Sequence, residues 1–186
     1  CAAAFARGLK SQGVLTAAKH FPGHGSSTAD SHLGFTDVTQ TWSEAELTPF
    51  SALIGQHLAD MIMTAHVFNA RLDGKDPATL SRPVITGLLR GRLGYDGVVV
   101  TDDMQMRAVN GRYGFKEALG RAVNAGADIL LIGDNLEYDA QIGPKALSDL
   151  MELVAEGVVP AARIRESYAR IMNLKQQGLA TAGALQ

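Results

Sequence analysis

The sequence contains little cysteine, no large excess of one charge and no long hydrophobic run. Its single cysteine, Cys1, excludes an internal disulfide and a thiolate metal site. The 17 basic and 19 acidic side chains nearly balance and are scattered along the chain, which argues against a nucleic-acid or membrane-surface partner. No run approaches the roughly 18 apolar residues that a spanning helix needs, so we expect no membrane segment.

What the chain does have is apolar material spread along its 186 residues. Hydrophobic residues make up 46% of it, enough for a core that needs no crosslink or metal. The first ten residues resemble the last turns of a helix already under way. We therefore expect the natural N-terminus to lie elsewhere, and this sequence does not decide whether a secretion signal exists.

Four short apolar runs predict strands. Each is followed by small or polar residues and then by a helical pattern. None alternates apolar with polar residues, which is typical of strands covered by helices on both faces of a parallel sheet. The runs are residues 14–18, 61–64, 98–101 and 129–132.

Helix start signals lie between these runs. Ser43 and Glu46 fit a capping box ahead of apolar residues at helical spacing. Ser81 and Pro83 supply a cap and an early proline for the next helix. Later helices are expected over residues 115–125, ended by Gly126, over 139–156, and over 161–177, ended by Gly178 and with Ile164, Tyr168, Ile171 and Leu174 on one apolar face.

Strand and helix patterns thus alternate along the whole chain. This alternation predicts an α/β fold with right-handed crossovers, either doubly wound or closed as a (β/α)₈ barrel. In both architectures, sites are built at the carboxyl ends of the strands. Polar side chains gather there in this sequence: His20, His24, Asp30 and His32 after the first run, His66 after the second, Asp102 and Asp103 after the third, and Asp134 and Asn135 after the fourth.

Several of these residues also have a purely structural interpretation. An aspartate after a strand can simply cap the next helix, as Asp103 could. His66 could be a buried histidine bonded to the backbone, and His57, inside an expected helix, is interpreted as a packing or surface residue. A functional role is favoured for Lys19 and His20, because lysine is rarely buried without an anionic or hydroxyl-rich partner.

The loop after the first run is the most informative segment. Residues 19–25 read Lys-His-Phe-Pro-Gly-His-Gly, and the glycines and proline suit a loop that folds over a pocket. Asp30 and His32 follow, spaced to bond to each other within one turn. An aspartate that orients a histidine fixes its tautomer and raises its basicity, as acid/base catalysis near neutral pH requires.

At these residues the chain resembles the family 3 glycoside hydrolases, and within them the β-N-acetylglucosaminidase branch. The resemblance covers nearly the whole chain through five blocks in the same order, which are residues 19–32, 63–66, 78–81, 97–104 and 124–128. It implies a (β/α)₈ TIM barrel that needs no cofactor and no metal. It also implies removal of terminal β-linked N-acetylglucosamine with retention, commonly from peptidoglycan fragments.

Carried over residue by residue, the resemblance assigns five roles. Asp102 matches the nucleophile, which forms a covalent glycosyl-enzyme through an oxocarbenium-like transition state. His32 matches the acid/base and Asp30 the residue that orients it, so an imidazole delivers the proton in place of a carboxylic acid. Lys19 and His20 match residues that bind sugar hydroxyls beside the nucleophile. Asp103 is left to cap the next helix or to support Asp102.

The chain has only four strand–helix units, whereas a complete barrel has eight in about 250 residues. They match the last four of the family's barrel, so residues 1–178 are expected to form its C-terminal part and 179–186 a flexible tail. Half a barrel exposes two sheet edges. We therefore expect association with a missing N-terminal half or self-association, and a small glycoside as substrate.

Other functions stay open from the sequence. Within the family the chain could be a β-glucosidase, or phosphate could intercept the covalent intermediate, because a neutral histidine repels an anion less than a carboxylate does. A metal-dependent hydrolase could use His20, His24, His32, His66 and Asp102. A non-catalytic half-barrel that only binds sugar is a further alternative. The expected compartment is the cytoplasm, from the lack of disulfides and the family's role in recycling.

Overall fold

The computed structural model describes residues 1–28, 34–133 and 138–183. Two 3₁₀ turns, η1 and η2, and one π-helix, η3, accompany the α-helices and strands. The elements in chain order are α1 (Ala2–Ser11), β1 (Ala17–Phe21), β2 (Thr36–Asp37), η1 (Glu44–Leu47), α2 (Thr48–Gly55), β3 (Met61–Thr64), β4 (Val67–Phe68), η2 (Ala78–Leu80), η3 (Pro83–Arg92), β5 (Val98–Val100), α3 (Arg107–Tyr113), α4 (Phe115–Ala125), α5 (Ile142–Ala155) and α6 (Ala161–Gly183).

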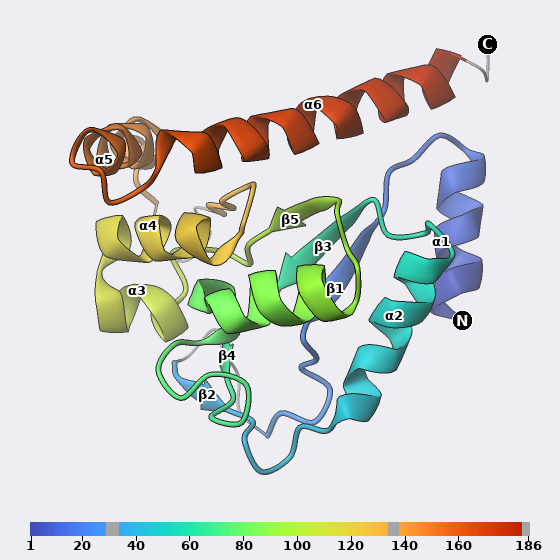
Figure 1. Cartoon of the computed structure of the whole chain (residues 1–186), viewed down its shortest axis with the longest axis horizontal. Helices are drawn as coiled ribbons and strands as arrows, with labels where there is room; N and C mark the ends of the chain where they lie inside the picture. Colours follow the sequence, from blue (N-terminus) through green and yellow to red (C-terminus); the bar gives the residue numbers. More distant parts are fainter. Residues whose placement is uncertain (29–33, 134–137, 184–186) are drawn as a thin grey trace.

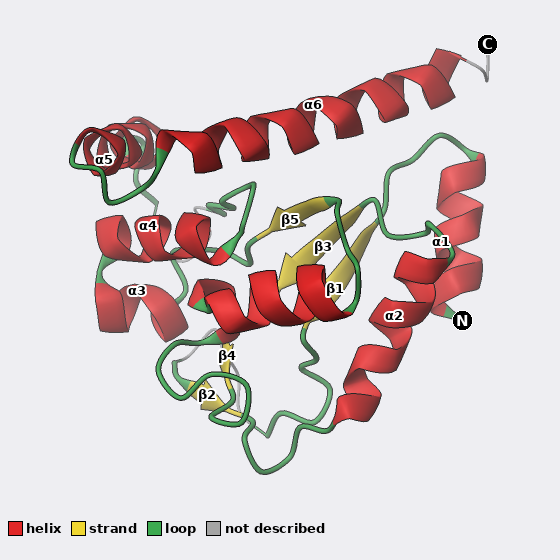
Figure 2. Ribbon diagram, in the orientation of Figure 1, coloured by secondary structure: helices red, strands yellow, loops and turns green. Residues whose placement is uncertain are grey.

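A parallel sheet of three strands lies at the centre, in the order β1-β3-β5 (Figure 1). Met61 aligns with Ala17 on one side and with Val98 on the other. A separate parallel pair, β2 and β4, lies beyond the carboxyl ends of these strands. Helices surround the sheet, with η3 across its front face, α1 and α2 beyond β1, and α6 along the top (Figure 2). The expected α/β class with a parallel sheet is confirmed.

The first expected strand lies three residues later than predicted. Strand β1 covers Ala17–Phe21, so Lys19 and His20 belong to the strand itself and do not follow it. Its alternating burial, with Ala17 and Lys19 exposed, also departs from the expected burial on both faces. Burial also alternates in the central strand β3, where Ile62 and Thr64 are buried and Met61 and Met63 are partly exposed. Among the three strands, burial of every residue holds in β5 alone.

The fourth expected strand is reduced to a single bridge. Val100 pairs in parallel with Ile129, and Ile129 donates its N–H to the Val99 carbonyl at 3.1 Å. Beyond the bridge, the side chain of Thr101 replaces the backbone partner, because its Oγ1 accepts the N–H of Leu131 at 2.9 Å. The segment still runs beside β5 without forming a regular ladder.

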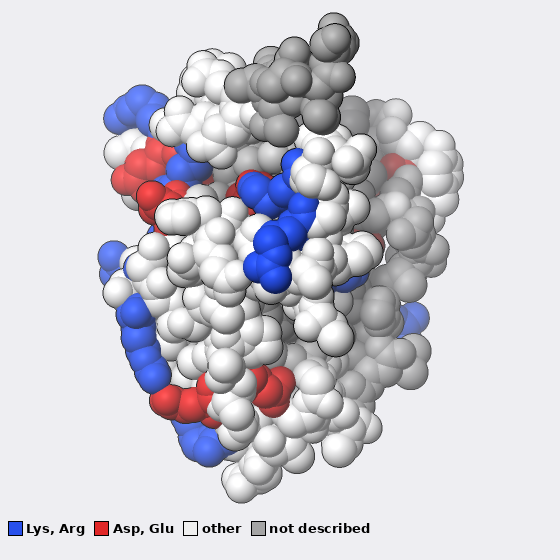
Figure 3. Space-filling model, turned by 90° about the vertical axis from the view of Figure 1, so that its right-hand side faces the viewer, with Lys and Arg blue, Asp and Glu red and all other residues white. Residues whose placement is uncertain are grey.

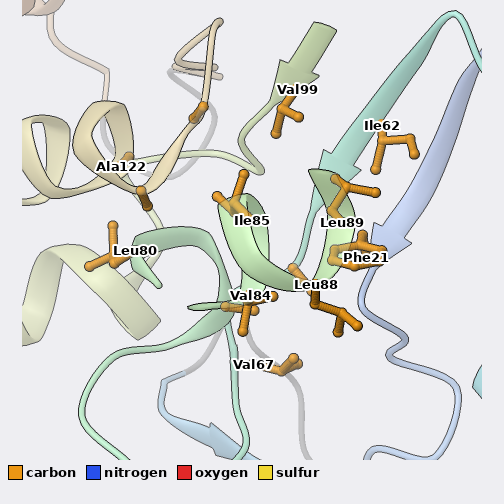
Figure 4. Packing of buried hydrophobic residues seen from close by; sticks show 14 of the residues in the cluster. Phe21, Ile62, Val67, Leu80, Val84, Ile85, Leu88, Leu89, Val99 and Ala122 are labelled. Atoms are coloured by element: carbon orange, nitrogen blue, oxygen red, sulfur yellow. The ribbon is translucent and has the colours of Figure 1, made fainter. Parts of the chain in front are cut away.

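The core fills the space between the sheet and the helix η3. Phe21, Ile62 and Val99 come from the three strands, and Ile85 and Leu89 from η3 pack on them (Figure 4). All five side chains are fully buried. Each such side chain contributes about 1.5–3 kcal/mol relative to an exposed one, so this packing fixes the strands whose ends carry the candidate site.

The later helices match their predictions in part. Helix α4 covers Phe115–Ala125 and ends at Gly126, as expected. Helix α6 begins at Ala161 as expected but continues through Gly178 to Gly183, so the predicted end is wrong. Gly178 keeps the helical conformation and packs against Leu15. The apolar face predicted for α6 is also wrong at Tyr168, which is 66% exposed.

The capping box predicted at Ser43 and Glu46 is wrong. Ser43 precedes the 3₁₀ turn η1 without a capping bond from its side chain. Glu46 turns its carboxylate elsewhere, to the loop after β1 described below. The cap predicted before η3 is confirmed, because Ser81 Oγ accepts the N–H of Val84 at 3.1 Å.

One buried carboxylate, that of Asp128, ties η3 and α6 to the sheet. Asp128 has no exposed side-chain surface and accepts hydrogen bonds from Arg90 of η3 and Arg163 of α6, both at 2.8 Å. Its Oδ2 also accepts the N–H of Val99 in β5 at 3.0 Å. Arg170 and Ser167, also on α6, complete the cluster. A single side chain therefore links the sheet to two helices, η3 and α6.

Candidate active site

The carboxyl ends of the three strands bring together residues from distant parts of the sequence. His20 lies near the end of β1, His66 follows β3 and Asp102 follows β5. His20 Nε2 and Asp102 Oδ2 are 3.7 Å apart, although β3 lies between their two strands. Their side chains are 29% and 16% exposed, so both are reachable from solvent. A carboxylate and an imidazole therefore face one another at the expected edge.

The backbone holds Asp102 in place from one side. Its Oδ1 accepts the N–H of Asp103 at 2.9 Å. Asp103 does not cap the next helix, because α3 begins only at Arg107; its own carboxylate accepts the N–H of Gln105 at 3.0 Å. Of the two roles expected for Asp103, capping of the next helix is therefore wrong, and the bond to Asp102 comes from the Asp103 backbone. The Oδ2 atom of Asp102 faces His20.

His66 is buried behind Asp102, with 1% of its surface exposed. Its Nδ1 lies 2.8 Å from Thr79 Oγ1, and its Nε2 lies 2.8 Å from the Asp103 carbonyl oxygen. Burial lowers the pKa of His66, although the Asp103 carbonyl and the charges of Asp102 and Asp103 act in the opposite direction. The sequence left open whether His66 is a buried histidine bonded to the backbone. The structure shows such a bond at Nε2, whereas Nδ1 contacts the side chain of Thr79.

A cavity of about 530 Å³ lies beside β1. Its polar lining consists of Thr16, Lys19, His20, His24 and Glu46, and most of the remaining lining comes from small and apolar residues of β1, α1 and α2. His24 packs near His20, with ring centroids 6.3 Å apart. Asp102 lies outside this lining, so the cavity approaches the candidate site from the side of Lys19 and His20.

Glu46 holds the loop that follows β1, a role that the sequence did not indicate. Its carboxylate accepts the N–H of Gly25 at 3.2 Å and a short hydrogen bond from Ser26 Oγ. Gly23 has a φ of +124°, and a Cβ at this position would lie 2.4 Å from Glu46 Oε2. A glycine is needed at position 23 because of its positive φ and because a side chain would clash with Glu46. The density of glycines in residues 19–25 was the only sequence signal, and it does not indicate Glu46 as the partner of this loop.

Four residues that the sequence singled out lie outside the described part of the chain. These are Asp30 and His32, the expected acid/base dyad, and Asp134 and Asn135 after the fourth run. Their roles stay predictions.

The described residues contain no group of three or more His, Cys, Asp or Glu side chains that could hold a metal ion. Of the ligands considered for a metal-dependent hydrolase, His20, His24, His66 and Asp102 are described, and His66 has both ring nitrogens engaged in hydrogen bonds. The metal interpretation thus gains no support from the residues at this edge.

On the face of the molecule that Figure 3 shows, most side chains are uncharged. The charged side chains there form small groups in which basic and acidic residues lie next to one another.

Within residues 1–28, 34–133 and 138–183, no helix is long and apolar enough to cross a membrane.

Comparison with known proteins places the chain in a family. Residues 1–174 match the glycosyl hydrolase family 3 N terminal domain. The β-hexosaminidase of Tolumonas auensis is 41% identical over 137 residues, which are 72% of this chain and 41% of that protein. The β-hexosaminidase LpqI of Mycobacterium tuberculosis is 35% identical over 182 residues, covering 94% of this chain and 45% of that protein.

Solved structures agree with these relatives. A family 3 β-N-acetylglucosaminidase from Paenibacillus sp. FPU-7 superposes with a TM-score of 0.87 at 41% identity, covering 95% of this chain and 34% of that one. The β-N-acetylglucosaminidase of Thermotoga maritima superposes with a TM-score of 0.74 at 30% identity, covering 89% of this chain and 35% of that one. The chain thus spans less than half the length of these relatives. It belongs to glycosyl hydrolase family 3.

Proposed function

We propose that this chain carries the catalytic centre of a retaining exo-β-N-acetylglucosaminidase. The observation that carries the proposal is the placement of Asp102 at the carboxyl end of β5, with one oxygen bound by the Asp103 N–H and the other facing His20. A strand end fixed by the core holds a nucleophile rigidly enough for attack on an anomeric carbon. The relatives named β-hexosaminidase support the choice of N-acetylglucosamine as the glycone.

The reaction proceeds in two displacements. In the first, Asp102 attacks the anomeric carbon while the glycosidic bond breaks, and His32 gives its proton to the leaving oxygen. Asp30 orients His32 for this step. In the second, His32 takes a proton from water, whose oxygen displaces Asp102 and releases the sugar with its original configuration. Peptidoglycan-derived glycosides are the substrate class we propose.

Lys19 and His20 bind hydroxyl groups of the sugar beside the nucleophile. His20 lies 3.7 Å from the Asp102 carboxylate, so a sugar hydroxyl near His20 is also near the reacting centre. Lys19 is exposed on β1 and lines the cavity next to it. A charged donor and an imidazole suit hydroxyl recognition, because hydrogen bonds that involve a charged group are stronger than neutral ones.

We further propose that the parallel strands belong to a (β/α)₈ barrel that this chain completes with another segment or with a second copy. Strand β1 pairs only with β3 in the described sheet. On its other side lies the cavity of about 530 Å³ between α1 and α2. An open strand edge next to an apolar hollow favours pairing with a further strand. Light scattering tests this: a stable monomer of this chain would contradict it.

The test of the activity is release of 4-nitrophenol from its β-N-acetylglucosaminide by this chain, compared with Asp102→Asn. We expect turnover that Asp102→Asn abolishes, while the matched surface variant Asp139→Asn retains it. The β-glucoside should react far more slowly, and added phosphate should leave the rate unchanged. A rate proportional to phosphate would mean phosphorolysis, and equal activity of Asp102→Asn would refute the assignment of the nucleophile.

A further inference from the structure

His66 is a buried side chain near the candidate site that is bonded at both of its ring nitrogens. It is 1% exposed, and each of its two ring nitrogens lies 2.8 Å from one oxygen. One oxygen is the Thr79 hydroxyl, from a residue that is itself fully buried, and the other is the Asp103 carbonyl. A histidine held at both nitrogens has a fixed ring orientation, so its position is part of the structure around Asp102.

The partners decide where the ring proton lies. A carbonyl oxygen only accepts hydrogen bonds, so Nε2 carries the proton and donates it to Asp103. The assignment of Nε2 does not depend on the other nitrogen. Nδ1 lies 2.8 Å from Thr79 Oγ1, whose own proton goes to the Ala65 carbonyl at 2.9 Å. Thr64 Oγ1 lies 2.8 Å from the same Thr79 oxygen, so a buried set of hydrogen bonds holds the Nδ1 side of the ring.

The chain of hydrogen bonds ends at the nucleophile. The Asp103 carbonyl accepts from His66 Nε2 and also from the Met106 N–H at 3.0 Å. The N–H of the same Asp103 donates to Asp102 Oδ1 at 2.9 Å. The backbone of Asp103 is therefore fixed at its carbonyl by a buried side chain, and at its N–H it orients the Asp102 carboxylate.

We propose that His66 is a positioning residue for Asp102. By donating its Nε2–H to the Asp103 carbonyl, it fixes the backbone of Asp103 on one side of its Cα, and the N–H on the other side of that Cα holds one oxygen of Asp102, so that the other oxygen is presented to the sugar. His66 does not touch the substrate. This inference rests on the proposed function of Asp102, and it adds a role to a residue that the sequence left between a structural and a metal-binding interpretation.

Loss of the His66 contact should slow the reaction, because nucleophilic attack requires the Asp102 carboxylate at an exact position. A nucleophile displaced by about 1 Å can cost on the order of 100-fold in rate, because the reacting atoms must meet at near-contact distance with aligned orbitals. Loss of the His66 bond leaves the Asp103 carbonyl with the Met106 N–H as its described partner. We therefore expect the turnover number to fall and substrate binding to change little.

Two substitutions of His66 separate positioning from simple packing. In His66→Gln the amide nitrogen reaches the place of Nε2 and can still donate to the Asp103 carbonyl. In His66→Asn the shorter amide reaches only the place of Nδ1, so it keeps the Thr79 contact and loses the Asp103 contact. Both are polar and smaller than or similar to histidine. His57→Asn makes the same chemical change at an exposed position and serves as the control.

Two readouts are measured on the full chain for each variant. The first is hydrogen exchange at the Asp103 amide by NMR, which reports its bond to Asp102 without any substrate. The second is kcat and KM per folded molecule, with thermal unfolding used to measure the folded fraction. We expect His66→Asn to speed exchange at Asp103 and to lower kcat about 100-fold with KM within about twofold. His66→Gln should stay within about tenfold of the unaltered chain in both.

Each other outcome is decisive. Unchanged exchange at Asp103 in His66→Asn would overturn the positioning role, whatever the activity. Faster exchange with unchanged kcat, or equal kcat for the Asn and Gln variants, would also overturn it. If the unaltered chain turns over no glycoside, the proposed activity has failed for this chain, and a change in Asp103 exchange in His66→Asn but not in His66→Gln still supports the structural part of the inference.

Discussion

Replacement of Asp128 by Asn tests the polar cluster that links η3 and α6 to the sheet. Asp128 is fully buried and accepts from Arg90 and Arg163 at 2.8 Å, and those side chains are only 14% and 12% exposed. Asn keeps the volume but removes the charge, so two largely buried guanidinium groups lose their shared counter-charge. Breaking one partner of a buried ion pair costs about 3–5 kcal/mol.

This free energy corresponds to a large shift in the unfolding temperature. For a chain of this size, 1 kcal/mol moves the midpoint by about 2–4 °C, so Asp128→Asn should lower it by roughly 6–20 °C. Differential scanning calorimetry at pH 7 measures the shift. The control is Glu44→Gln, which breaks the exposed pair with Arg92 and should leave the midpoint nearly unchanged. A shift for Asp128→Asn no larger than that of the control would show that the Asp128 charge does not stabilise the fold.

The same cluster predicts a pH dependence. Burial alone raises the pKa of Asp128, but the Val99 N–H, Arg163 and Arg90 together outweigh it and hold the pKa below its usual value. A carboxyl whose pKa is lower in the folded chain stabilises the fold above its unfolded pKa, near 3.9, and this contribution disappears as the pH falls through the folded pKa. The difference in stability between the unaltered chain and Asp128→Asn should therefore be largest near neutral pH and shrink below about pH 4. A difference that stays constant to pH 3 would contradict this.

Two further substitutions test local geometry. Gly126→Ala should destabilise the chain by about 1–2 kcal/mol. Gly126 has a φ of +123°, and an added Cβ would lie 3.0 Å from both Ile85 Cγ2 and Thr86 Oγ1. Urea unfolding measures the change in stability, and a neutral effect would show that the turn relaxes. Glu46→Ala should raise the exchange rate of the Gly25 amide about tenfold, since a hydrogen bond to a carboxylate contributes about 1.5 kcal/mol; an unchanged rate would show that Glu46 does not hold this loop.

Much of the fold could be predicted from the sequence because its signals are local. The runs at 61–64 and 98–101 are strands within one residue, since β-branched and apolar residues bounded by polar ones mark buried strands. Gly126 ends α4 as predicted because a positive φ is easily adopted only by glycine. Gly178 carries the same signal, yet α6 continues through it, because a glycine need not leave the helical conformation.

The predictions that failed depend on contacts distant in sequence. The capping box at Glu46 fits its local pattern, but Gly25 and Ser26 compete for the carboxylate from 21 and 20 residues away. Strand β1 begins later than predicted because its register is set by pairing with β3. The short run at 129–132 forms only one bridge because the Thr101 side chain takes the next N–H.

In the candidate site too, the features with a local sequence signal could be predicted and the contacts between distant segments could not. Histidine and aspartate at strand ends were visible in the sequence, and the structure brings His20 and Asp102 within 3.7 Å. The part played by Thr79 was not visible, because a threonine in a short turn carries no signal for a bond to His66, which lies 13 residues before it. Such partners are determined by the fold, since they join side chains from different loops around one buried histidine.

The most direct test of the account is to identify the residue that becomes glycosylated. The chain is incubated with a slow fluorinated N-acetylglucosaminide that accumulates a covalent intermediate, digested, and mapped by mass spectrometry. We expect one N-acetylglucosaminyl-derived adduct on the peptide that contains Asp102, and no adduct in Asp102→Asn. An adduct on another residue, or turnover by the unaltered chain with sugar released in inverted configuration, would contradict the claim that Asp102 is the nucleophile of a retaining enzyme.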